Sequence, residues 1–391
     1  MRGLPRTFWS LWAGALINRL GTFLEPFLAL YLTTARDVSV GRAGTVVAMI
    51  GAGSVIAQPL GGGLADRVGR RPTLVGGMVA SGVAIAALAL ARPVWLIAVC
   101  ALLVGICGDL YRPAAQATIA DVVPLADRRR ASALMFWAIN LGFSVAGVAG
   151  GLLARSGYGL LFALDALTCV GYAAVVWATM PETRPAEARH PDAPGWGAVL
   201  GDRLAMGFFG LNLAVATVYA TLFTIMPLAM AADGHGPSTY GAVIALNGIL
   251  IVVLNPILAA RLLRMAPARA LAIGALLTGS AMVVVAAGDA VATYVAAVAL
   301  ITLGEIFNAS SSYGLVGEIA PAALRGRYAG AFGLTFGAAF TITPLLGGAL
   351  LGDGGSATPW IAAAALAVVA AGGLLALGPA LEARRAVAAL G

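Results

Sequence analysis

The feature that most constrains this fold is a series of apolar runs, each long enough to cross a lipid bilayer. About 20 residues of helix span the roughly 30 Å hydrocarbon core, and charged or turn-forming residues separate twelve such runs along the 391-residue chain. The runs fall at about 7–33, 41–63, 72–91, 94–120, 131–154, 158–180, 204–231, 238–261, 268–288, 291–316, 328–352 and 357–379. The sequence therefore predicts an all-α membrane protein with twelve transmembrane helices.

The first run resembles a secretory signal peptide at its start, because two arginines precede an apolar stretch. Asn18, Arg19 and Glu25 interrupt that stretch, and it continues to about Leu32. The apolar core of a cleaved signal is shorter and uninterrupted. We therefore expect a first span that is retained.

Charge is sparse, and its distribution indicates topology. The chain is 60% hydrophobic and 10% charged, its net charge is +7, and all 24 of its basic residues are arginine. The arginines sit in short loops, which argues against a nucleic-acid partner and for a bilayer. Most lie on the side that holds both termini and the even-to-odd loops. Only four lie in the opposite loops: Arg36, Arg42, Arg92 and Arg155. Both termini are thus expected in the cytoplasm.

The two halves of the chain repeat. A constant shift of 197 residues superimposes several equivalent pairs, namely Pro59 on Pro256, Asp121 on Glu318, Pro124 on Pro321, Arg128 on Arg325 and Gly150-Gly151 on Gly347-Gly348. The polar segment 181–203 lies between the halves. The repeat predicts an N-terminal six-helix bundle at 1–180, a cytoplasmic linker at 181–203 and a C-terminal six-helix bundle at 204–391.

The stretch GGGLADRVGRRP at 61–72 is a dense polar turn between two apolar runs. Its glycines, including Gly62 and Gly69, are expected to let two helices and their turn approach closely. Asp66 and Arg70 lie where the second span meets the cytoplasm, and Asp121 ends the fourth span on the same side. This spacing resembles the signature loop of the major facilitator superfamily.

That resemblance implies a transporter of two six-helix bundles, rather than an enzyme, with a small-molecule substrate held between the bundles. It also implies that Asp66, Arg70 and Asp121 form a charge cluster that stabilises one conformational state. Separating one member of a partly desolvated cluster is costly because it leaves a charge without its partner. The alternative is plain positive-inside topology, which explains the arginines but not Asp66 or the glycines.

Six ionisable residues fall at membrane depth, where a charge costs about 2.5–3.5 kcal/mol on insertion scales. They are Arg19, Glu25, Asp109, Arg112, Asp165 and Glu305. Asp109 and Arg112 share a helix face and can pair, and Arg112 can alternatively pair with Asp165. A carboxyl group in an apolar site has a raised pKa and can bind and release a proton near neutral pH, so Glu305 and Asp109 are the candidate proton carriers. Glu305 also has no basic residue within a helical turn on its own span. The alternative is a set of structural ion pairs.

The stretches INRLGTFLEPFLALYL at 17–32 and GDLYRPAAQATIADVV at 108–123 resemble those of the drug–proton antiporters of bacterial inner membranes. Gly142 and Gly150-Gly151 fit the antiporter motif of span 5, although Ala146-Gly147 replaces its central Gly-Pro. A cavity that mixes carboxylates with aromatic groups suits amphipathic cations. Its candidate lining is Phe23, Phe27, Tyr219, Phe223, Asn308 and Tyr313.

We therefore expect proton-coupled efflux by a monomer that uses the proton gradient and no cofactor. Pro181-Glu182-Thr183-Arg184 resembles a sugar-porter signature, so import of a sugar or other metabolite stays an alternative. A membrane enzyme or receptor is an alternative of another class. The three cysteines lie inside apolar spans, which argues against a disulfide framework and, with no histidine cluster, against a metal site.

Overall fold

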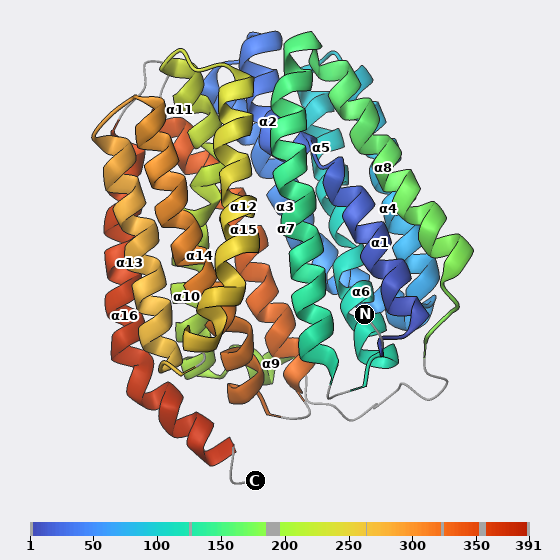
Figure 1. The fold of residues 1–391 in the computed structure, drawn as a ribbon, viewed down its shortest axis with the longest axis vertical. Coiled ribbons are helices and arrows are strands. Elements are labelled where there is room, and N and C mark those ends of the chain that lie inside the picture. The colour runs from blue at the N-terminus through green and yellow to red at the C-terminus, as the bar shows by residue number, and fades with distance from the viewer. Residues whose placement is uncertain are drawn as a thin grey trace. The chain divides into compact units, whose positions relative to one another are not determined.

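The computed structural model describes residues 3–124, 127–184, 196–262, 264–321, 324–351 and 357–388, and helices dominate these ranges (Figure 1). The first predicted span contains α1 (Arg6–Leu20), α2 (Leu24–Leu30) and the π-helical segment η1 (Tyr31–Ala35). It is followed by α3 (Val40–Arg67), α4 (Arg70–Leu90), α5 (Val94–Asp109), α6 (Tyr111–Val122), α7 (Arg128–Leu153), η3 (Ala154–Ser156) and α8 (Tyr158–Thr179). The later helices are α9 (Trp196–Leu200), α10 (Arg203–Thr224), α11 (Met226–Ala232), α12 (Pro237–Leu262), α13 (Pro267–Ala286), α14 (Val291–Ile319), α15 (Arg325–Leu351) and α16 (Thr358–Ala388).

In the described part of the chain, eleven helices have the length and hydropathy of membrane spans. Each corresponds to one predicted run, so the predicted all-α membrane fold is confirmed. The remaining run, the first in the chain, is also helical. It is divided into segments that are each too short to span a bilayer alone.

Three of the predicted spans are interrupted, and each break lies just before a proline. The breaks and their prolines are Gly21–Phe23 with Pro26, Leu110 with Pro113, and Ile225 with Pro227. Proline has no N–H, and its ring clashes with the carbonyl group four residues earlier, which favours a break at these positions. Other prolines, such as Pro59 in α3 and Pro256 in α12, lie inside a continuous helix. Each break frees backbone groups at membrane depth, and these groups need partners within the protein.

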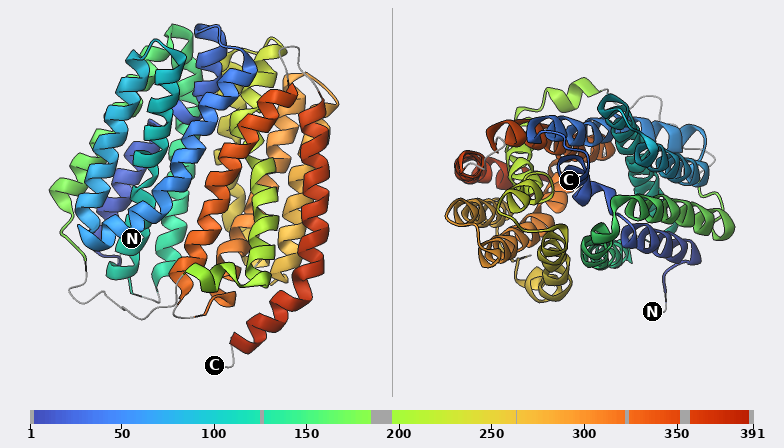
Figure 2. Two further views of the ribbon diagram at one scale, coloured as in Figure 1. Left: turned by 180° about the vertical axis from the view of Figure 1, so that it is seen from behind. Right: turned by 90° about the horizontal axis from the view of Figure 1, so that it is seen from above.

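The chain forms two compact units, residues 1–189 with 235–249 and residues 190–234 with 250–391. In the first unit α3 packs against α5, α4 contacts α5 and α8, and α1 contacts α7 and α8 (Figure 2). In the second unit α13 contacts α14 and α16, while α10 contacts α15 and α16. The start of α12 therefore belongs to the first unit and its end to the second. The domain boundaries inferred from the repeat stay a prediction.

Aromatic side chains lie at the centre of each unit's core. In the first unit the rings of Tyr111 and Tyr172 meet edge to face with centroids 5.7 Å apart. In the second unit Phe208 stacks on Phe332 at 6.0 Å. Such ring pairs stabilise a core by about 0.5–1.5 kcal/mol beyond their buried area. The packing of Tyr111 also holds its hydroxyl group at the edge of a polar pocket that is described below.

Candidate functional site

The predicted loop between spans 2 and 3 is a turn of two residues, Val68 and Gly69, between α3 and α4. Gly69 has a φ of +120°, which a residue with a Cβ rarely adopts. A Cβ at this position would also lie 2.5 Å from a carboxylate oxygen of Glu182. The backbone conformation of the turn therefore requires glycine, and a side chain here would also displace the Glu182 carboxylate.

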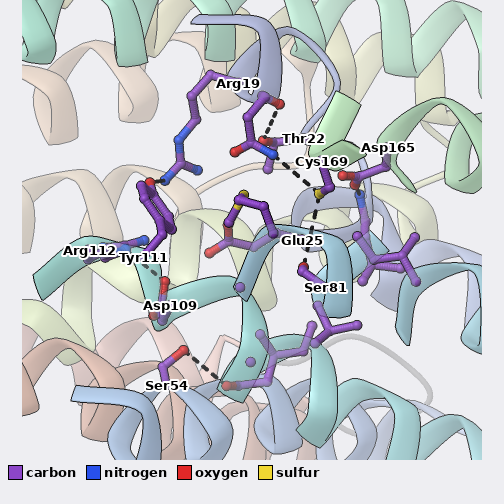
Figure 3. Close-up of a pocket in the computed structure, with 18 residues that line it drawn as sticks. Arg19, Thr22, Glu25, Ser54, Ser81, Asp109, Tyr111, Arg112, Asp165 and Cys169 are labelled. Carbon is purple, nitrogen blue, oxygen red and sulfur yellow. Dashed lines mark hydrogen bonds and ion pairs between the residues drawn. The ribbon is translucent and has the colours of Figure 1, made fainter. Parts of the chain in front are cut away.

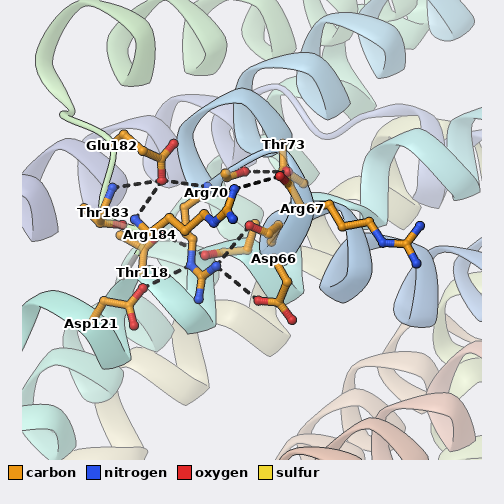
Figure 4. Close-up of polar contacts among 12 residues, drawn as sticks. Asp66, Arg67, Arg70, Thr73, Thr118, Asp121, Glu182, Thr183 and Arg184 are labelled. Carbon is orange, nitrogen blue, oxygen red and sulfur yellow. Dashed lines mark hydrogen bonds and ion pairs between the residues drawn. The ribbon is translucent and has the colours of Figure 1, made fainter. Parts of the chain in front are cut away.

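Arg70 lies at the centre of a charge cluster beside this turn (Figure 4). Its Nε donates to Asp121 Oδ2 and its Nη1 donates to Asp66 Oδ1, each at 3.1 Å. The side chains of Arg70, Asp121 and Asp66 are 6%, 19% and 63% exposed. The three predicted residues thus meet, and the shielded Arg70–Asp121 pair carries most of the interaction because water weakens the exposed one.

Glu182 joins this cluster, and the sequence reasoning did not predict it. Its carboxylate accepts the backbone N–H groups of Arg70 at 2.9 Å and Arg71 at 3.1 Å, at the N-terminus of α4. It also accepts those of Thr183 and Arg184. Burial acts to raise the pKa of Glu182, but the four backbone hydrogen bonds outweigh it, so the pKa lies below its usual value. Glu182 belongs to the Pro-Glu-Thr-Arg string at 181–184, and its contact with the start of α4 explains an acidic residue at this position of the string.

Two arginines connect the end of α8 and the segment after it to the same turn. Arg184 Nη1 donates to the carbonyl oxygen of Arg67 at 2.7 Å. The Arg71 guanidinium lies 4.3 Å from the ring centroid of Trp177 and donates to the carbonyl oxygen of that residue. We name Asp66, Arg70, Asp121 and Glu182 the loop cluster. It connects four elements of the first unit: α3, α4, α6 and the segment that follows α8.

The glycines before the turn differ from our expectation. A Cβ at Gly62 would meet nothing within 4 Å among the described residues, so this position does not provide a close helix approach. The close approach occurs one residue earlier, where a Cβ at Gly61 would lie 2.7 Å from the carbonyl oxygen of Leu110. A helix face rotates by about 100° per residue, and the motif alone does not reveal which glycine faces the neighbour.

A polar pocket of about 90 Å³ lies within the first unit, among the first span, α3, α4, α5 with α6, and α8 (Figure 3). Five of the six candidate ionisable residues line it: Arg19, Glu25, Asp109, Arg112 and Asp165. A site for a drug-sized ligand has about 300–1,000 Å³. This pocket therefore suits water, an ion or a ligand of few heavy atoms.

One side of the pocket is formed by Arg19, Tyr111, Asp109 and Arg112 (Figure 3). Arg19 Nη2 donates to the Tyr111 hydroxyl at 3.1 Å. Arg112 Nε lies 2.7 Å from Asp109 Oδ1, which confirms that these two residues pair. Tyr111 was not predicted as a site residue, although it lies between two that were.

Two charged groups in the pocket, Arg19 and Glu25, form no ion pair with a described residue. The Nε atom of Arg19 is shielded from solvent and has no hydrogen-bond partner among the described residues. The Glu25 carboxylate makes no hydrogen bond or ion pair within the described ranges, although Arg19 lies within electrostatic range. The pocket therefore presents one donor and one acceptor of opposite charge.

Asp165 has a different role from the predicted pairing with Arg112. Its Oδ2 accepts the backbone N–H groups of Phe23 at 2.9 Å and Leu24 at 2.8 Å. These groups begin α2 after the break in the first span. Asp165 thus provides acceptors for the backbone donors that the break exposes. These hydrogen bonds offset the cost of burying an aspartate at membrane depth.

The glycines of α7 contact two elements. A Cβ at Gly142 would lie 2.6 Å from Arg19 Cβ, and one at Gly150 would lie 2.6 Å from the Phe27 ring. On another face, a Cβ at Gly151 would lie 2.9 Å from the carbonyl oxygen of Pro237, at the start of α12. Small residues thus allow α7 to pack closely against the first span and against α12.

The predicted aromatic lining is largely packed within each unit. Phe27 is fully buried against Tyr240 with ring centroids 5.6 Å apart, and Phe23 is buried as well. In the second unit Phe223 contacts both Tyr219 and Phe340. The side chain of Tyr313 lies outside the described residues.

Glu305 and Asn308 lie on α14 in the second unit, both partly buried. Asn308 Nδ2 donates to the Gly304 carbonyl oxygen at 3.0 Å, while its shielded Oδ1 has no partner among the described residues. The described ranges hold no group of three His, Cys, Asp or Glu side chains that could bind a metal ion.

Known proteins with similar sequences and folds are transporters. The sequence profile of the Major Facilitator Superfamily matches residues 11–228 and again 211–388. The chain is 26% identical over 355 residues to a Na(+), Li(+), K(+)/H(+) antiporter of Planococcus maritimus, which covers 82% of this chain and 83% of that protein. It is 28% identical over 376 residues to the multidrug resistance protein MdtH of Cronobacter sakazakii, covering 93% and 92%. The structure of a POT family transporter in complex with 5-aminolevulinic acid matches 97% of this chain and 98% of its own with a TM-score of 0.81 at 14% identity, which shows a shared fold.

Proposed function

Because this chain belongs to the Major Facilitator Superfamily and is a multi-pass membrane transporter, we propose that it exports amphipathic or other small organic molecules in exchange for protons. Relatives named as a cation–proton antiporter and as a multidrug resistance protein support exchange and export. Rocking of two halves about a shared substrate site is the cycle that we propose.

The observation that carries this proposal is the gathering of charge in the polar pocket. Five ionisable side chains from the first span, α5, α6 and α8 line a space of about 90 Å³. Charges at membrane depth are costly and persist where they pair, face water or move protons. Asp109 has a cation beside it and Asp165 has two backbone donors, whereas Glu25 has neither. We therefore add Glu25 to Glu305 and Asp109 as a proton carrier.

We assign the loop cluster the role of a conformational latch in the same cycle. Its shielded Arg70–Asp121 pair is favourable when assembled and costly when one partner is left without the other. A cluster of this kind biases a two-state equilibrium towards the state in which it is complete. Glu182 adds backbone hydrogen bonds to that state.

The proposal is tested by flux in proteoliposomes with an imposed pH gradient, using a panel of cationic drugs, sugars and peptides. Substrate-induced proton movement is compared between wild type, Glu305→Gln and Glu25→Gln, with Glu382→Gln as the control at an exposed position of α16. We expect uphill transport to be lost in a carrier variant while downhill exchange persists. Wild-type protein that moves substrate without protons would contradict proton coupling.

A second candidate is antiport of a monovalent cation against protons. The size of the pocket and its three carboxylates favour this function over transport of a bulky drug at that position, and one relative carries this name. The measurement is proton release from the same proteoliposomes on addition of NaCl, KCl or LiCl. Choline chloride serves as the control for ionic strength.

A further inference from the structure

We propose that the polar pocket of the first unit binds a small zwitterion, a molecule with a protonated amine at one end and a carboxylate at the other. This inference rests on the proposed export function, because it names a substrate class for the same transporter. Its argument comes from the pocket alone.

Charge complementarity is the first step. Of the five ionisable groups that line the pocket, Asp109 and Arg112 neutralise each other at 2.7 Å. Asp165 is committed to two backbone N–H groups of the broken first span. Arg19 and Glu25 are left, one cation and one anion. A simple cation or a simple anion would satisfy one of them, whereas a zwitterion satisfies both.

Unsatisfied hydrogen-bonding capacity is the second step. The Arg19 Nε donor is shielded and has no partner among the described residues, and the Tyr111 hydroxyl holds the guanidinium through Nη2. A carboxylate is the acceptor that a guanidinium binds best. Glu25 lies in the middle of the pocket (Figure 3), where its oxygens can accept from an ammonium group. Leaving both groups unmatched is costly.

Size is the third step. A space of about 90 Å³ accommodates several waters, which is the scale of an amino acid and not of a typical drug. Hydroxyl groups of Thr22, Ser54 and Ser81 also line the pocket. Their oxygens can accept hydrogen bonds from a compact polar ligand, and apolar side chains such as Ile50, Met78 and Val104 line the rest of the space.

The test measures binding to the purified full-length protein in detergent, with no gradient. Isothermal titration and thermal unfolding compare L-alanine with its single-charge fragments, ethylamine and propionate. Glycine, β-alanine and 4-aminobutyrate then vary the separation between the two charges. We expect binding of the zwitterions with one preferred length, and at least about tenfold weaker binding of either fragment, since each loses one charge-assisted hydrogen bond.

Variants locate the site. Arg19→Gln and Glu25→Gln should each weaken zwitterion binding by about 10–100-fold, while Glu382→Gln should not change it. The comparison of ligands on wild-type protein does not depend on how well the variants fold.

Equal binding of ethylamine and L-alanine, stabilisation by NaCl or KCl alone, or no binding of any probe to wild type would overturn the proposal. Because no gradient is used, zwitterion binding without proton-coupled flux would contradict only the proposed function. Proton-coupled flux of other substrates without zwitterion binding would contradict only this inference.

Discussion

Arg70 bonds two carboxylates whose surroundings differ greatly. Asp121 is 19% exposed and Asp66 is 63% exposed, although both lie 3.1 Å from the guanidinium. A screened surface pair contributes about 0–1 kcal/mol, and a hydrogen bond to a shielded charged group contributes about 1.5–3 kcal/mol. The two aspartates should therefore be separable by experiment.

The first prediction is that Asp121→Asn lowers the free energy of unfolding by about 1.5–3 kcal/mol, because it leaves the shielded Arg70 with a weaker partner. Asp66→Asn should lower it by less than about 1 kcal/mol yet still reduce transport sharply if the latch function is correct. The measurements are thermal unfolding in detergent and flux in proteoliposomes. Normal flux in well-folded Asp66→Asn protein would remove Asp66 from the latch.

The second prediction concerns Glu182 and pH. Its folded-state pKa lies below the ordinary value, so its stabilisation is present above the unfolded pKa of about 4.3 and is lost as the pH falls through the folded value. The melting temperature of wild type should exceed that of Glu182→Gln by a constant margin from pH 8 to 6. The margin should shrink below about pH 4. Glu382→Gln serves as the control, and a margin that grows on acidification would contradict the assignment.

At the scale of elements, the α3–α4 turn depends on one glycine and not on its neighbour. Gly69 combines a φ of +120° with a close contact to Glu182, whereas Gly62 is an interior residue of α3 with open space around it. The motif contains both glycines, but only Gly69 has a backbone conformation that other residues rarely adopt.

The third prediction is therefore that Gly69→Ala destabilises the protein by about 1–3 kcal/mol and weakens the latch. Gly62→Ala should instead be neutral or stabilising by up to about 1 kcal/mol, because alanine favours a helix interior. Thermal unfolding of the two variants side by side checks this. Equal destabilisation would show that Gly62 has a contact that the structure does not contain.

The equivalent elements of the second unit use different residues. In the repeat, Glu318 corresponds to Asp121, but the equivalent of Gly69 is Ala266. Glu318 pairs with Arg385 near the end of α16. Asp202 caps α10 and binds Tyr328 and Arg384. Burial acts to raise the pKa of Asp202, but these partners lower it overall. In the described part of the second unit, two arginines of the terminal helix α16 thus pair with acidic residues at the start of α10 and the end of α14.

At the scale of the molecule, the fourth prediction concerns topology. Single cysteines at Asp127 and Gly197, in a variant without the three native cysteines, should react with an impermeant reagent only from the cytoplasmic side. A cysteine at Arg92 should react from the outside. The reason is the arginine excess of the loops on the first side. Labelling of Gly197→Cys from outside intact cells would invert the orientation.

The sequence by itself determined the class of this protein, because bilayer thickness fixes the length of a span and the loop motif is long and specific. It also identified Arg19, Glu25, Asp109, Arg112 and Asp165, since any charge at membrane depth is conspicuous. Only the tertiary structure decided which partner each of these residues binds. It assigned Asp165 to the break in the first span, added Glu182 and Tyr111, and moved the close helix approach from Gly62 to Gly61. Asp165, Glu182 and Tyr111 each bind a partner from a distant segment of the chain, and the hydrophobic pattern does not show which distant segments meet. Gly61 and Gly62 face different directions because a helix turns by about 100° per residue, and the motif spacing does not show which of them faces the neighbouring helix.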